Sequence, residues 1–549
     1  MDRIWLKSYP DNFVSEISQN KHNSIIDLMN EATKKFSKNK AFSNLNSQLT
    51  YQEIKKFSEK FGGFLQHKLT IKKSTNIAIM LPNLLSYPVA VFGSFIAGGI
   101  VVNVNPLFKQ REILNVLIDS KAEIIIVLDR FLEELEPIIN QTKLKHIIVC
   151  DVTDLLNPLM KFVVKIVLGI KGPKVKQLKS TYIKFSDIIK YEKKPNKILL
   201  SREDIALLQY TGGTTGKSKA AVLTHGNLLS NIEQLSIWIG KSIEIGKESI
   251  VTALPLYHIF SLTVNFLYFF SIGSKNILIT NPRDLKSFVK TLRTNKFTVI
   301  TAVNTLFNLL LSSSSFKKID FKHLKFSVGG GMAVLKNTAQ RWKKITQTNI
   351  TQGYGLTETS PVISVNIISD EYNGTIGLPL PSTDISLRDD KGNEIGIDEV
   401  GELCVKGPQV MKNYWNNINE TKNAFTEDGF FKTGDIASID KNGYIKIVDR
   451  KKDMIISSGF NVYPNEIEDY VATHPDILEC GVIGIPDINR GESIKLFVVT
   501  SNVDLKKNDI LSFCKEGLTV YKIPKIIEFI DELPKNNVGK ILRRKLREL

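Results

Sequence analysis

Residues 123–128 read Glu-Ile-Ile-Ile-Val-Leu, an apolar run of strand length behind a single acidic residue. Residues 77–81 (Ile-Ala-Ile-Met-Leu) and 100–102 (Ile-Val-Val) repeat the pattern, and segments of helical periodicity separate the three runs. Strands that are apolar at nearly every position are typical of a parallel sheet with helices on both faces, because both sides of each strand are buried. The region from residue 24 to about 149 therefore predicts α/β layering.

A second series of short apolar runs lies at residues 250–254, 276–279 and 298–301, with a helix expected over 283–295. This repetition predicts a second sheet of the same kind. The longest apolar stretch, residues 89–102, is interrupted by four Gly or Ser residues and is shorter than the roughly 20 residues that cross a bilayer. We interpret it as a buried helix followed by a strand.

Beyond about residue 374 the chain is rich in Gly and Asp, as at 392–394, 427–429 and 441–443. Frequent turns between short strands are typical of antiparallel hairpins, so this region predicts a small β-barrel or sandwich. After the charged run 449–453 (Asp-Arg-Lys-Lys-Asp) helices and strands mix again. We place the main domain boundary at this run.

The expected fold class is α/β. At 549 residues the chain has room for three or four folding units, at roughly 150 residues each. We expect a large N-terminal domain, 1–449, with two doubly wound sheets and a small β-barrel at about 374–449. A smaller α+β C-terminal domain, 454–549, follows.

The composition is basic, with 73 Lys and Arg against 56 Asp and Glu and a net charge of +17. Such an excess suits nucleic acid, a phospholipid surface or a polyphosphate cofactor, and a lysine-rich genome explains it equally well. The four cysteines lie far apart, with no Cys-x-x-Cys and no histidine at zinc spacing. This pattern disfavours a disulfide framework or a structural zinc and fits a reducing cytosol.

Residues 159–179 contain six lysines, no acidic residue and many apolar side chains, whereas the N-terminus lacks the apolar run of a signal peptide. A basic amphipathic segment can lie in a bilayer interface, where each lysine near an anionic surface contributes about 1 kcal/mol. The pattern also fits a surface helix packed on the sheet. Both interpretations stay open from the sequence.

Residues 210–219 read Tyr-Thr-Gly-Gly-Thr-Thr-Gly-Lys-Ser-Lys. Glycines let backbone N–H groups converge on phosphate oxygens, threonines add hydroxyl donors, and the lysines supply positive charge. The segment is not a Walker loop, because Thr211 stands where that pattern requires the first glycine. It predicts a phosphate-binding loop of another class.

Four further segments accompany this loop: 352–359 (Gln-Gly-Tyr-Gly-Leu-Thr-Glu-Thr), 432–435 (Lys-Thr-Gly-Asp), 449–453 and 537–541 (Asn-Val-Gly-Lys-Ile). In this order, they resemble the adenylate-forming superfamily of acyl-CoA synthetases, luciferases and peptide-synthetase adenylation domains. Residues 428–452 are similar to the signature of fatty acyl-CoA synthetases. The resemblance extends along nearly the whole chain.

This resemblance implies ATP-dependent activation of a long-chain fatty acid. An acyl-adenylate forms with release of pyrophosphate, and the CoA thiol then displaces AMP. Mg²⁺ is the implied cofactor, with ATP and CoA as cosubstrates. Residues 450–453 are the implied hinge, about which a mobile C-terminal domain acts as a lid on the N-terminal adenylation domain.

Two alternatives to this function are loading of an acyl carrier protein and a non-catalytic lipid-binding role. We expect a cytoplasmic protein without a nucleic-acid partner. Peripheral association with the inner membrane surface and a homodimeric state are further expectations.

The resemblance assigns nucleotide roles to several residues. Glycines 329–331 and Tyr354 are expected to enclose adenine, Asp435 and Arg450 to bind the ribose, and Glu358 to hold Mg²⁺ with Thr211 nearby. Without this context, the glycines would indicate a turn and Asp435 a turn cap. The expected ATP-binding residues are Thr211, Gly212, Gly213, Thr214, Thr215, Gly216, Lys217, Gly329, Gly330, Gly331, Tyr354, Asp435 and Arg450.

The implied catalytic residues are Lys540, Thr357, Glu358 and His258. Lys540 would bridge the carboxylate and the α-phosphate, although an isolated basic run at 540–547 predicts a solvated helix face. Lys452 is the implied hinge residue. The expected CoA surface is Ser458, Gly459 and Phe460, and the expected acyl-tunnel residues are Phe260, Leu262, Val264, Val303 and Thr305.

Overall fold

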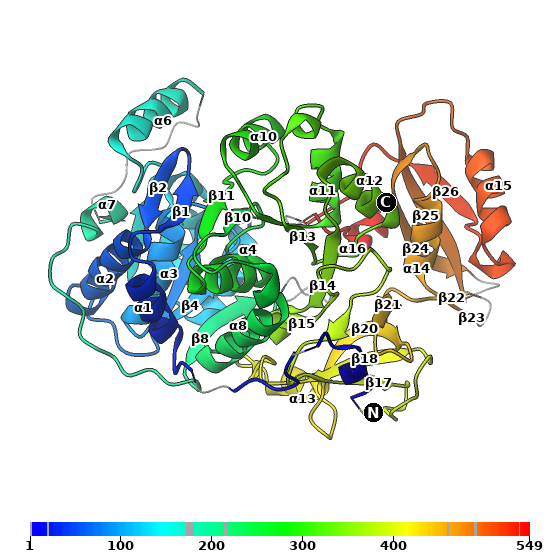
Figure 1. The fold of residues 1–549 in the computed structure, drawn as a ribbon, viewed down its shortest axis with the longest axis horizontal. Helices are drawn as coiled ribbons and strands as arrows, with labels where there is room; N and C mark the ends of the chain where they lie inside the picture. The colour runs from blue at the N-terminus through cyan, green and yellow to red at the C-terminus, as the bar shows by residue number, and fades with distance from the viewer. Residues whose placement is uncertain are drawn as a thin grey trace.

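The computed structural model describes residues 3–549 except 12, 19–20, 172–180, 212–217, 458–459, 488–490 and 537–538. Within the described residues, two large sheets, a small antiparallel sheet and a C-terminal sheet form the fold (Figure 1).

The first large sheet has eight strands. In spatial order they are β19 (Asn413–Tyr414), β9 (Ala220–Thr224), β8 (Ile205–Tyr210), β4 (Ile100–Asn103), β3 (Asn76–Met80), β5 (Ile124–Leu128), β6 (His146–Cys150) and β7 (Ile183–Lys184). The strands from β8 to β7 are parallel, whereas β9 is antiparallel to both β8 and β19.

The second large sheet has nine strands. In spatial order they are β16 (Leu378–Pro379), β15 (Val362–Val365), β14 (Ile350–Gly355), β13 (Phe326–Gly329), β12 (Val299–Ala302), β10 (Ser249–Thr252), β11 (Lys275–Leu278), β1 (Lys40–Asn44) and β2 (Ser47–Thr50). Its centre is parallel, and β2, β15 and β16 add antiparallel pairs at the two edges. Both sheets are therefore mixed, whereas the apolar runs alone predict parallel sheets.

The principal helices are α1 (Ile25–Lys35), α2 (Tyr51–His67), α3 (Ser86–Ile96), α4 (Gln110–Ser120), α6 (Pro158–Lys171), α8 (His225–Ile239), η5 (Ser261–Tyr268), α10 (Leu285–Thr294), α11 (Asn304–Ser312) and α12 (Lys336–Thr346). Capping boxes start three of them, since the side chains of Ser24, Thr50 and Thr224 accept the N–H of the residue three positions on.

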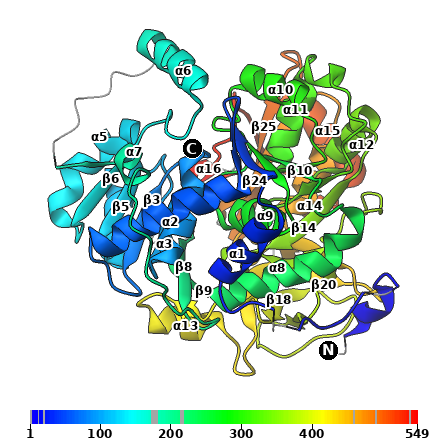
Figure 2. The same cartoon turned by 60° about the vertical axis from the view of Figure 1, so that its left-hand side comes forward.

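Alternate residues of the central strands enter different cores. Ile77 and Ile79 of β3 belong to the core between the two sheets, which also receives Ile250 of β10 and helices α1, α2, α3 and α8 (Figure 2). Met80 faces a second core with α4, and Val251 faces a third with α10 to α12. Both faces of each strand are thus buried, which explains the continuous apolar runs.

The turn-rich region forms a small antiparallel sheet of β17 (Asp384–Arg388), β18 (Gly401–Lys406), β20 (Phe431–Ile439) and β21 (Ile445–Arg450). Its order, β17-β18-β20-β21, is open, so the expected barrel is replaced by a sheet. The N-terminal arm packs on this sheet, where Trp5 lies so close to Gly443 that a Cβ there would collide with it. The glycine has φ +85°.

The C-terminal part has its own α+β fold. Its elements are β22 (Ile455–Ser457), β23 (Phe460–Val462), α14 (Pro464–Val471), β24 (Ile477–Asp487), β25 (Gly491–Thr500), α15 (Lys507–Gly517), β26 (Ile526–Phe529) and α16 (Arg543–Leu546). A separate apolar core lies between this sheet and helices α14 and α15. Across the described part of the chain, we find no helix long and apolar enough to span a membrane.

Candidate active site

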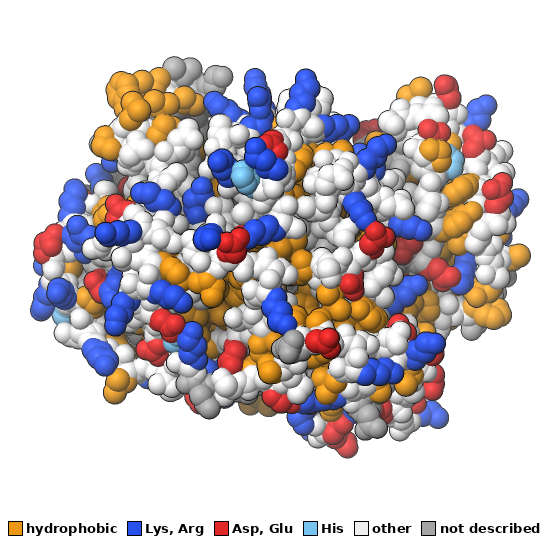
Figure 3. All heavy atoms as spheres, viewed as in Figure 1, with side chains coloured by type: hydrophobic (Ala, Val, Ile, Leu, Met, Phe, Trp, Pro, Cys, Tyr) orange, Lys and Arg blue, Asp and Glu red, His pale blue; other side chains and the backbone are white. Residues whose placement is uncertain are grey.

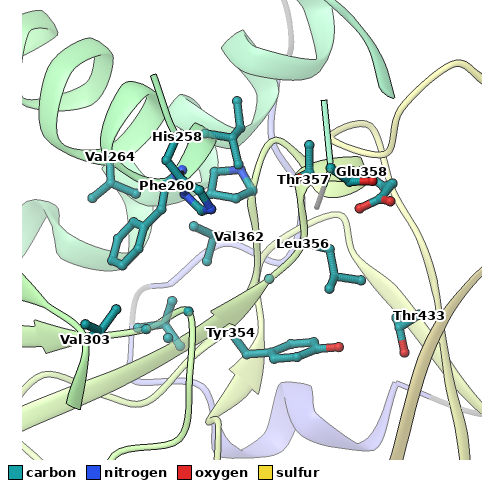
Figure 4. Close-up of a pocket in the computed structure, with 18 of the residues that line it drawn as sticks. His258, Phe260, Val264, Val303, Tyr354, Leu356, Thr357, Glu358, Val362 and Thr433 are labelled. Atoms are coloured by element: carbon teal, nitrogen blue, oxygen red, sulfur yellow. Dashed lines mark hydrogen bonds between the residues drawn. The ribbon is translucent and has the colours of Figure 1, made fainter. Parts of the chain in front are cut away.

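A cavity of about 510 Å³, the main cavity, lies where the two large sheets, the small sheet and the C-terminal part meet. Figure 4 shows Phe260, Val264 and Val303 on one side of it and Glu358 and Thr433 on the other. A second cavity of about 270 Å³ shares several of its lining residues. The main cavity thus joins an apolar wall to a charged end.

The structure brings together most of the residues expected in the site. The main cavity is lined by Thr211, His258, Phe260, Val264, Val303, Gly330, Gly331, Tyr354, Thr357, Glu358, Arg450 and Lys540. Thr305 and Asp435 line the second cavity, which also reaches Gly331, Tyr354, Arg450 and Lys540.

Other expected residues lie elsewhere. Leu262 and Gly329 are buried and line neither cavity, and Lys452 lies in the turn after β21 without reaching either. Phe460 is 53% exposed and stacks on Tyr521, with ring centres 4.6 Å apart. The following residues lie outside the described part of the chain: Gly212, Gly213, Thr214, Thr215, Gly216, Lys217, Ser458 and Gly459.

The predicted phosphate loop connects β8 and β9, which pair antiparallel up to Tyr210 and Ala220. The Thr211 N–H donates to the Lys219 carbonyl at 2.8 Å and closes the base of the loop. The Lys219 ammonium forms an ion pair with Glu420 of α13 (Ile418–Ala424) and lies 5.4 Å from the centre of the Tyr414 ring. Helix α13 therefore anchors the end of the loop.

Glu358 lies in a short turn of helix, η7 (Thr357–Thr359), directly after β14. Its carbonyl accepts the Met411 N–H at 2.6 Å, and its Oε1 accepts the Tyr414 hydroxyl at 2.7 Å. Burial raises the pKa of the Glu358 carboxyl. A positive charge bound nearby would favour the ionised form.

The donor set around Glu358 fits Mg²⁺. Glu358 and the Thr211 hydroxyl line the same cavity, and a hard cation of this kind prefers oxygen ligands. The described residues contain no group of three or more His, Cys, Asp or Glu that could hold a metal. A magnesium ion held here would take its remaining ligands from water and substrate phosphates.

Asp435 is 3% exposed and faces its cross-strand partner Arg450. The Arg450 Nε lies 3.1 Å from Asp435 Oδ1, and the Tyr354 hydroxyl donates to Oδ2 at 2.5 Å. The strand pairing of β20 and β21 therefore positions the carboxylate. Backbone also approaches closely at Gly330, where a Cβ would lie 3.1 Å from the Gly353 carbonyl oxygen.

Lys540 follows a tight turn. The Lys540 N–H donates to Asn536 Oδ1 at 2.8 Å, and the Asn536 N–H donates to the Lys540 carbonyl at 2.8 Å. Gly539, with φ +87°, fits against Thr305 so tightly that a Cβ would collide with its hydroxyl. This contact docks the C-terminal part on α11 and brings Lys540 into both cavities.

The electrostatics at Lys540 are unusual. Burial, together with the positive charge of Arg450, lowers the pKa of Lys540 to about 7. Burial and the charge of Lys540 lower the pKa of His258 to about 4. The negative charge of Asp435 partly offsets these effects at Lys540, although the structure shows no salt bridge to its ammonium among the described residues. An anionic ligand would favour the charged form further.

Two groups of residues in the site are not identified by the sequence patterns. Tyr414 and Glu420 lie in a segment without a recognisable local motif, although they contact Glu358 and Lys219. Arg543 belongs to a basic run that predicts a solvated helix face. Instead its guanidinium is largely buried, 2.7 Å from Glu468 and 3.5 Å from Asp453. Only the contacts with Glu468 and Asp453, which are distant in sequence, reveal that Arg543 forms buried ion pairs.

A model of the AMP-binding enzyme family matches residues 29–415, and a model of the AMP-binding enzyme C-terminal domain matches residues 466–540. A long-chain-fatty-acid–CoA ligase of Escherichia coli O6:H1 is 46% identical over 100% of this chain and 98% of its own. One of Bacillus subtilis is 34% identical over 99% and 97%. The crystal structure of ATP-bound MatB from Rhodopseudomonas palustris has a TM-score of 0.82 and 25% identity, covering 96% of this chain and 99% of that one. The chain therefore belongs to the family of AMP-binding enzymes.

Proposed function

We propose that this protein is a long-chain fatty acid–CoA ligase that works through an acyl-adenylate. The observation that carries the proposal is a single cavity that joins an apolar wall to the Glu358 carboxylate and the Lys540 ammonium. A fatty acid has the same two parts, an apolar chain and a charged end. The full-length relatives named long-chain-fatty-acid–CoA ligase support this substrate and this reaction.

In the first half-reaction, a carboxylate oxygen of the fatty acid bonds to the α-phosphorus of ATP. The bond from that phosphorus to the oxygen of pyrophosphate breaks. Both reactants are anions, so catalysis depends mainly on positioning and on positive charge at the reacting oxygens. Lys540 supplies this charge, and the arriving anions favour its protonated form.

The nucleotide binds across the boundary of the two cavities. Asp435 accepts hydrogen bonds from the ribose hydroxyls, while Tyr354 and Arg450 hold its carboxylate in place. Thr357 donates to the α-phosphate. Glu358 and Thr211 hold Mg²⁺, which neutralises phosphate charge when bound.

In the second half-reaction, the CoA sulfur bonds to the acyl carbon, the bond to the AMP oxygen breaks, and the thiol proton goes to solvent. We assign this step to a second arrangement, in which the C-terminal domain (454–549) rotates about the hinge at 450–453 and withdraws Lys540. Rotation at Lys452 would break the hydrogen bond from the Asn465 N–H to Asp449, 2.8 Å long. It would also separate Gly539 from Thr305.

We place the enzyme in the cytoplasm, at the inner surface of the membrane. All four cysteines are free and buried, which supports a reducing compartment. Its substrate partitions into bilayers, which supports a position beside one.

The test is a product assay with purified protein, ATP, Mg²⁺, CoA and fatty acids of graded chain length. We expect acyl-CoA, AMP and pyrophosphate in equal amounts, with the highest kcat/KM for long chains. Formation of ADP, or acyl transfer to an acyl carrier protein but not to CoA, would overturn the proposal. Absence of activity with short-chain acids alone would leave the proposal intact.

A further inference from the structure

A cluster of charged and polar side chains crosses the boundary between the small sheet and the C-terminal part. Figure 1 shows strand β21 of the small sheet beside helix α14 of the C-terminal part. In Figure 3, acidic and basic side chains lie close together where the C-terminal part, on the right, meets the rest of the molecule. Two buried acids belong to this cluster, Asp449 near the end of β21 and Asp453 in the hinge. The contacts at the hinge therefore include charges that are shielded from water.

Asp449 is fully buried, and its carboxylate takes partners from the C-terminal part. Its Oδ2 accepts the Asn465 N–H at 2.8 Å, whereas its Oδ1 accepts the N–H of the neighbouring Arg450 at 2.6 Å. The Arg543 guanidinium lies 3.9 Å from Oδ1. Burial raises the pKa of Asp449 to about 6, and the charge of Arg543 and the Asn465 N–H oppose this rise. Two residues of the C-terminal part thus stabilise the ionised carboxylate.

Arg543 connects the hinge with the rest of the C-terminal part. One of its amino groups donates to Glu468 Oε2 and to Asn465 Oδ1, both at 2.7 Å. The other lies 3.5 Å from Asp453 Oδ2. Arg547, four residues further on, donates to Asp453 Oδ1 at 3.2 Å. The two arginines therefore bind the C-terminal part to the hinge.

The distances within the cluster allow it to open. Arg543 and Glu468 lie in the same domain, so their contact at 2.7 Å would survive a rotation about the hinge. The longer contacts of Arg543 with Asp449 and Asp453, at 3.9 and 3.5 Å, would be lost. A guanidinium that keeps one carboxylate avoids the large cost of an unpaired buried charge. The cluster is therefore suited to break and form again in each turnover.

The cluster also lies close to Lys540 along the chain. Only two residues separate Lys540 from Arg543. On the other side of Lys540, Gly539 fits tightly against Thr305. A guanidinium that is held by Asp449 therefore limits the movement of the backbone that carries Lys540 into the two cavities.

We propose that this cluster is a latch across the hinge, which holds Lys540 in the adenylation arrangement and opens before thioester formation. Its members are Asp449 and Asp453 on one side and Asn465, Glu468 and Arg543 on the other. The inference rests on the rotation in the proposed function and adds the residues that resist it. Arg543 is the positioning residue. A weaker latch favours the second half-reaction at the expense of the first.

The experiment compares the two half-reactions in the R543M and D449N variants of the full-length protein. Fatty-acid-dependent ATP–pyrophosphate exchange should fall about tenfold in each, through kcat and not through the KM for ATP. Thioester formation from supplied acyl-adenylate and CoA should stay the same or rise up to about threefold. The double variant should lose no more exchange than R543M alone, because both changes remove the same contact. R543K keeps the charge and should lose no more than about threefold.

A second readout follows the arrangement of the domains and does not depend on activity. Spin labels at K344C in α12 and K507C in α15 report the distance between the domains by pulsed electron paramagnetic resonance. Both positions are exposed, and the four native cysteines are buried, so the labels react at the introduced positions. R543M and D449N should each lower the ratio of the adenylation arrangement to the open arrangement about tenfold.

Matched controls break ion pairs that lie wholly within the C-terminal part. R544M removes the neighbouring arginine, which lies 3.4 Å from Glu548. K495M removes a largely buried lysine that lies 2.9 Å from Glu528, and it should lower the melting temperature. Neither control should change the ratio of the two half-reactions. A failure of the proposed function would appear in the parent protein, whereas a failure of the latch would appear only in the variants.

Three outcomes would overturn the proposal. One is an equal loss of both half-reactions in R543M and D449N, which a merely structural role would produce. Another is a rise in the KM for ATP at unchanged kcat, because Arg543 lines the second cavity and would then contact the nucleotide. The third is a distribution of distances between the spin labels that neither variant changes.

Discussion

Three described lysines line the main cavity, and two of them, Lys219 and Lys540, differ in what surrounds them. Lys219 is paired with Glu420 and lies over the Tyr414 ring. Lys540 is partly buried without a salt bridge among the described residues, and its pKa is lowered to about 7. Lys219 belongs to a closed structural contact, whereas the charge of Lys540 is opposed by burial and would be favoured by an anionic ligand.

The comparison distinguishes a lysine that stabilises the structure from a lysine that takes part in the proposed reaction. A lysine that forms an ion pair with a carboxylate holds two elements together, here the end of the predicted phosphate loop and α13. A buried lysine without one responds strongly to an arriving anion, because burial penalises its charged form until a partner appears. We therefore expect large kinetic effects of substitutions at Lys540 and small ones at Lys219.

The largest effect is expected for Lys540→Ala. Loss of a charge that acts in the transition state should lower adenylation, measured as fatty-acid-dependent ATP–pyrophosphate exchange, by about 10³-fold. Conversion of supplied acyl-adenylate and CoA to thioester should change less than threefold, since the proposed rotation would have withdrawn Lys540 by then. Equal loss in both assays would argue against the hinge at 450–453.

The second-largest effect on adenylation is expected for substitution of Glu358. Glu358→Gln should lower adenylation about 10²-fold and raise the Mg²⁺ concentration needed for half-maximal rate, because a neutral amide binds a hard cation poorly. Tyr414→Phe removes the hydroxyl that holds Oε1 and should raise this Mg²⁺ requirement about tenfold at unchanged thermal stability. An unchanged requirement in both variants would remove Glu358 from the metal site.

The effect of pH on adenylation should be smaller than that of the Glu358 substitutions and larger than that of changes at the Lys219–Glu420 pair. Lys540 is charged below its pKa of about 7, so kcat/KM should fall about tenfold per pH unit above 7. His258, with a pKa of about 4, stays neutral through this range. In Lys540→Arg the alkaline fall should disappear, because arginine stays protonated. A fall that persists in this variant would assign the titration to another group.

The smallest effect is expected for the Lys219–Glu420 pair. Both side chains are partly exposed, and such pairs contribute about 0.2–1 kcal/mol. Lys219→Met and Glu420→Gln should each lower adenylation two- to fivefold, and the double variant should lose no more than either one. A hundredfold loss for Lys219→Met alone would show that this lysine contacts phosphate directly, and the contrast with Lys540 would fail.

The sequence predicts the central strands within two residues, because both of their faces are buried and their apolar runs are continuous. It does not predict the antiparallel direction of β9 or β15, since a loop of given length connects either arrangement. It also predicts a barrel or sandwich, whereas the strand order β17-β18-β20-β21 does not close on itself. Turn residues indicate hairpins but do not indicate whether a sheet closes.

The residues of the candidate site also differ in how well the sequence predicts them. Residues within local motifs, such as Glu358 and Asp435, can be named from sequence, and both line a cavity. Tyr414 and Arg543 cannot, because their roles depend on contacts 56 and 75 residues away along the chain. The central glycines of the phosphate loop lie outside the described residues, so their role stays a prediction.

The most direct test measures the titration of Lys540 itself. Competitive labelling of lysines with acetic anhydride at graded pH, read by mass spectrometry with exposed Lys507 as internal reference, gives its pKa in the folded protein. We expect a Lys540 pKa near 7 in the free enzyme and a clear rise when a non-hydrolysable ATP analogue and a fatty acid are both bound. A Lys540 pKa near 10.5 that no ligand changes would contradict it.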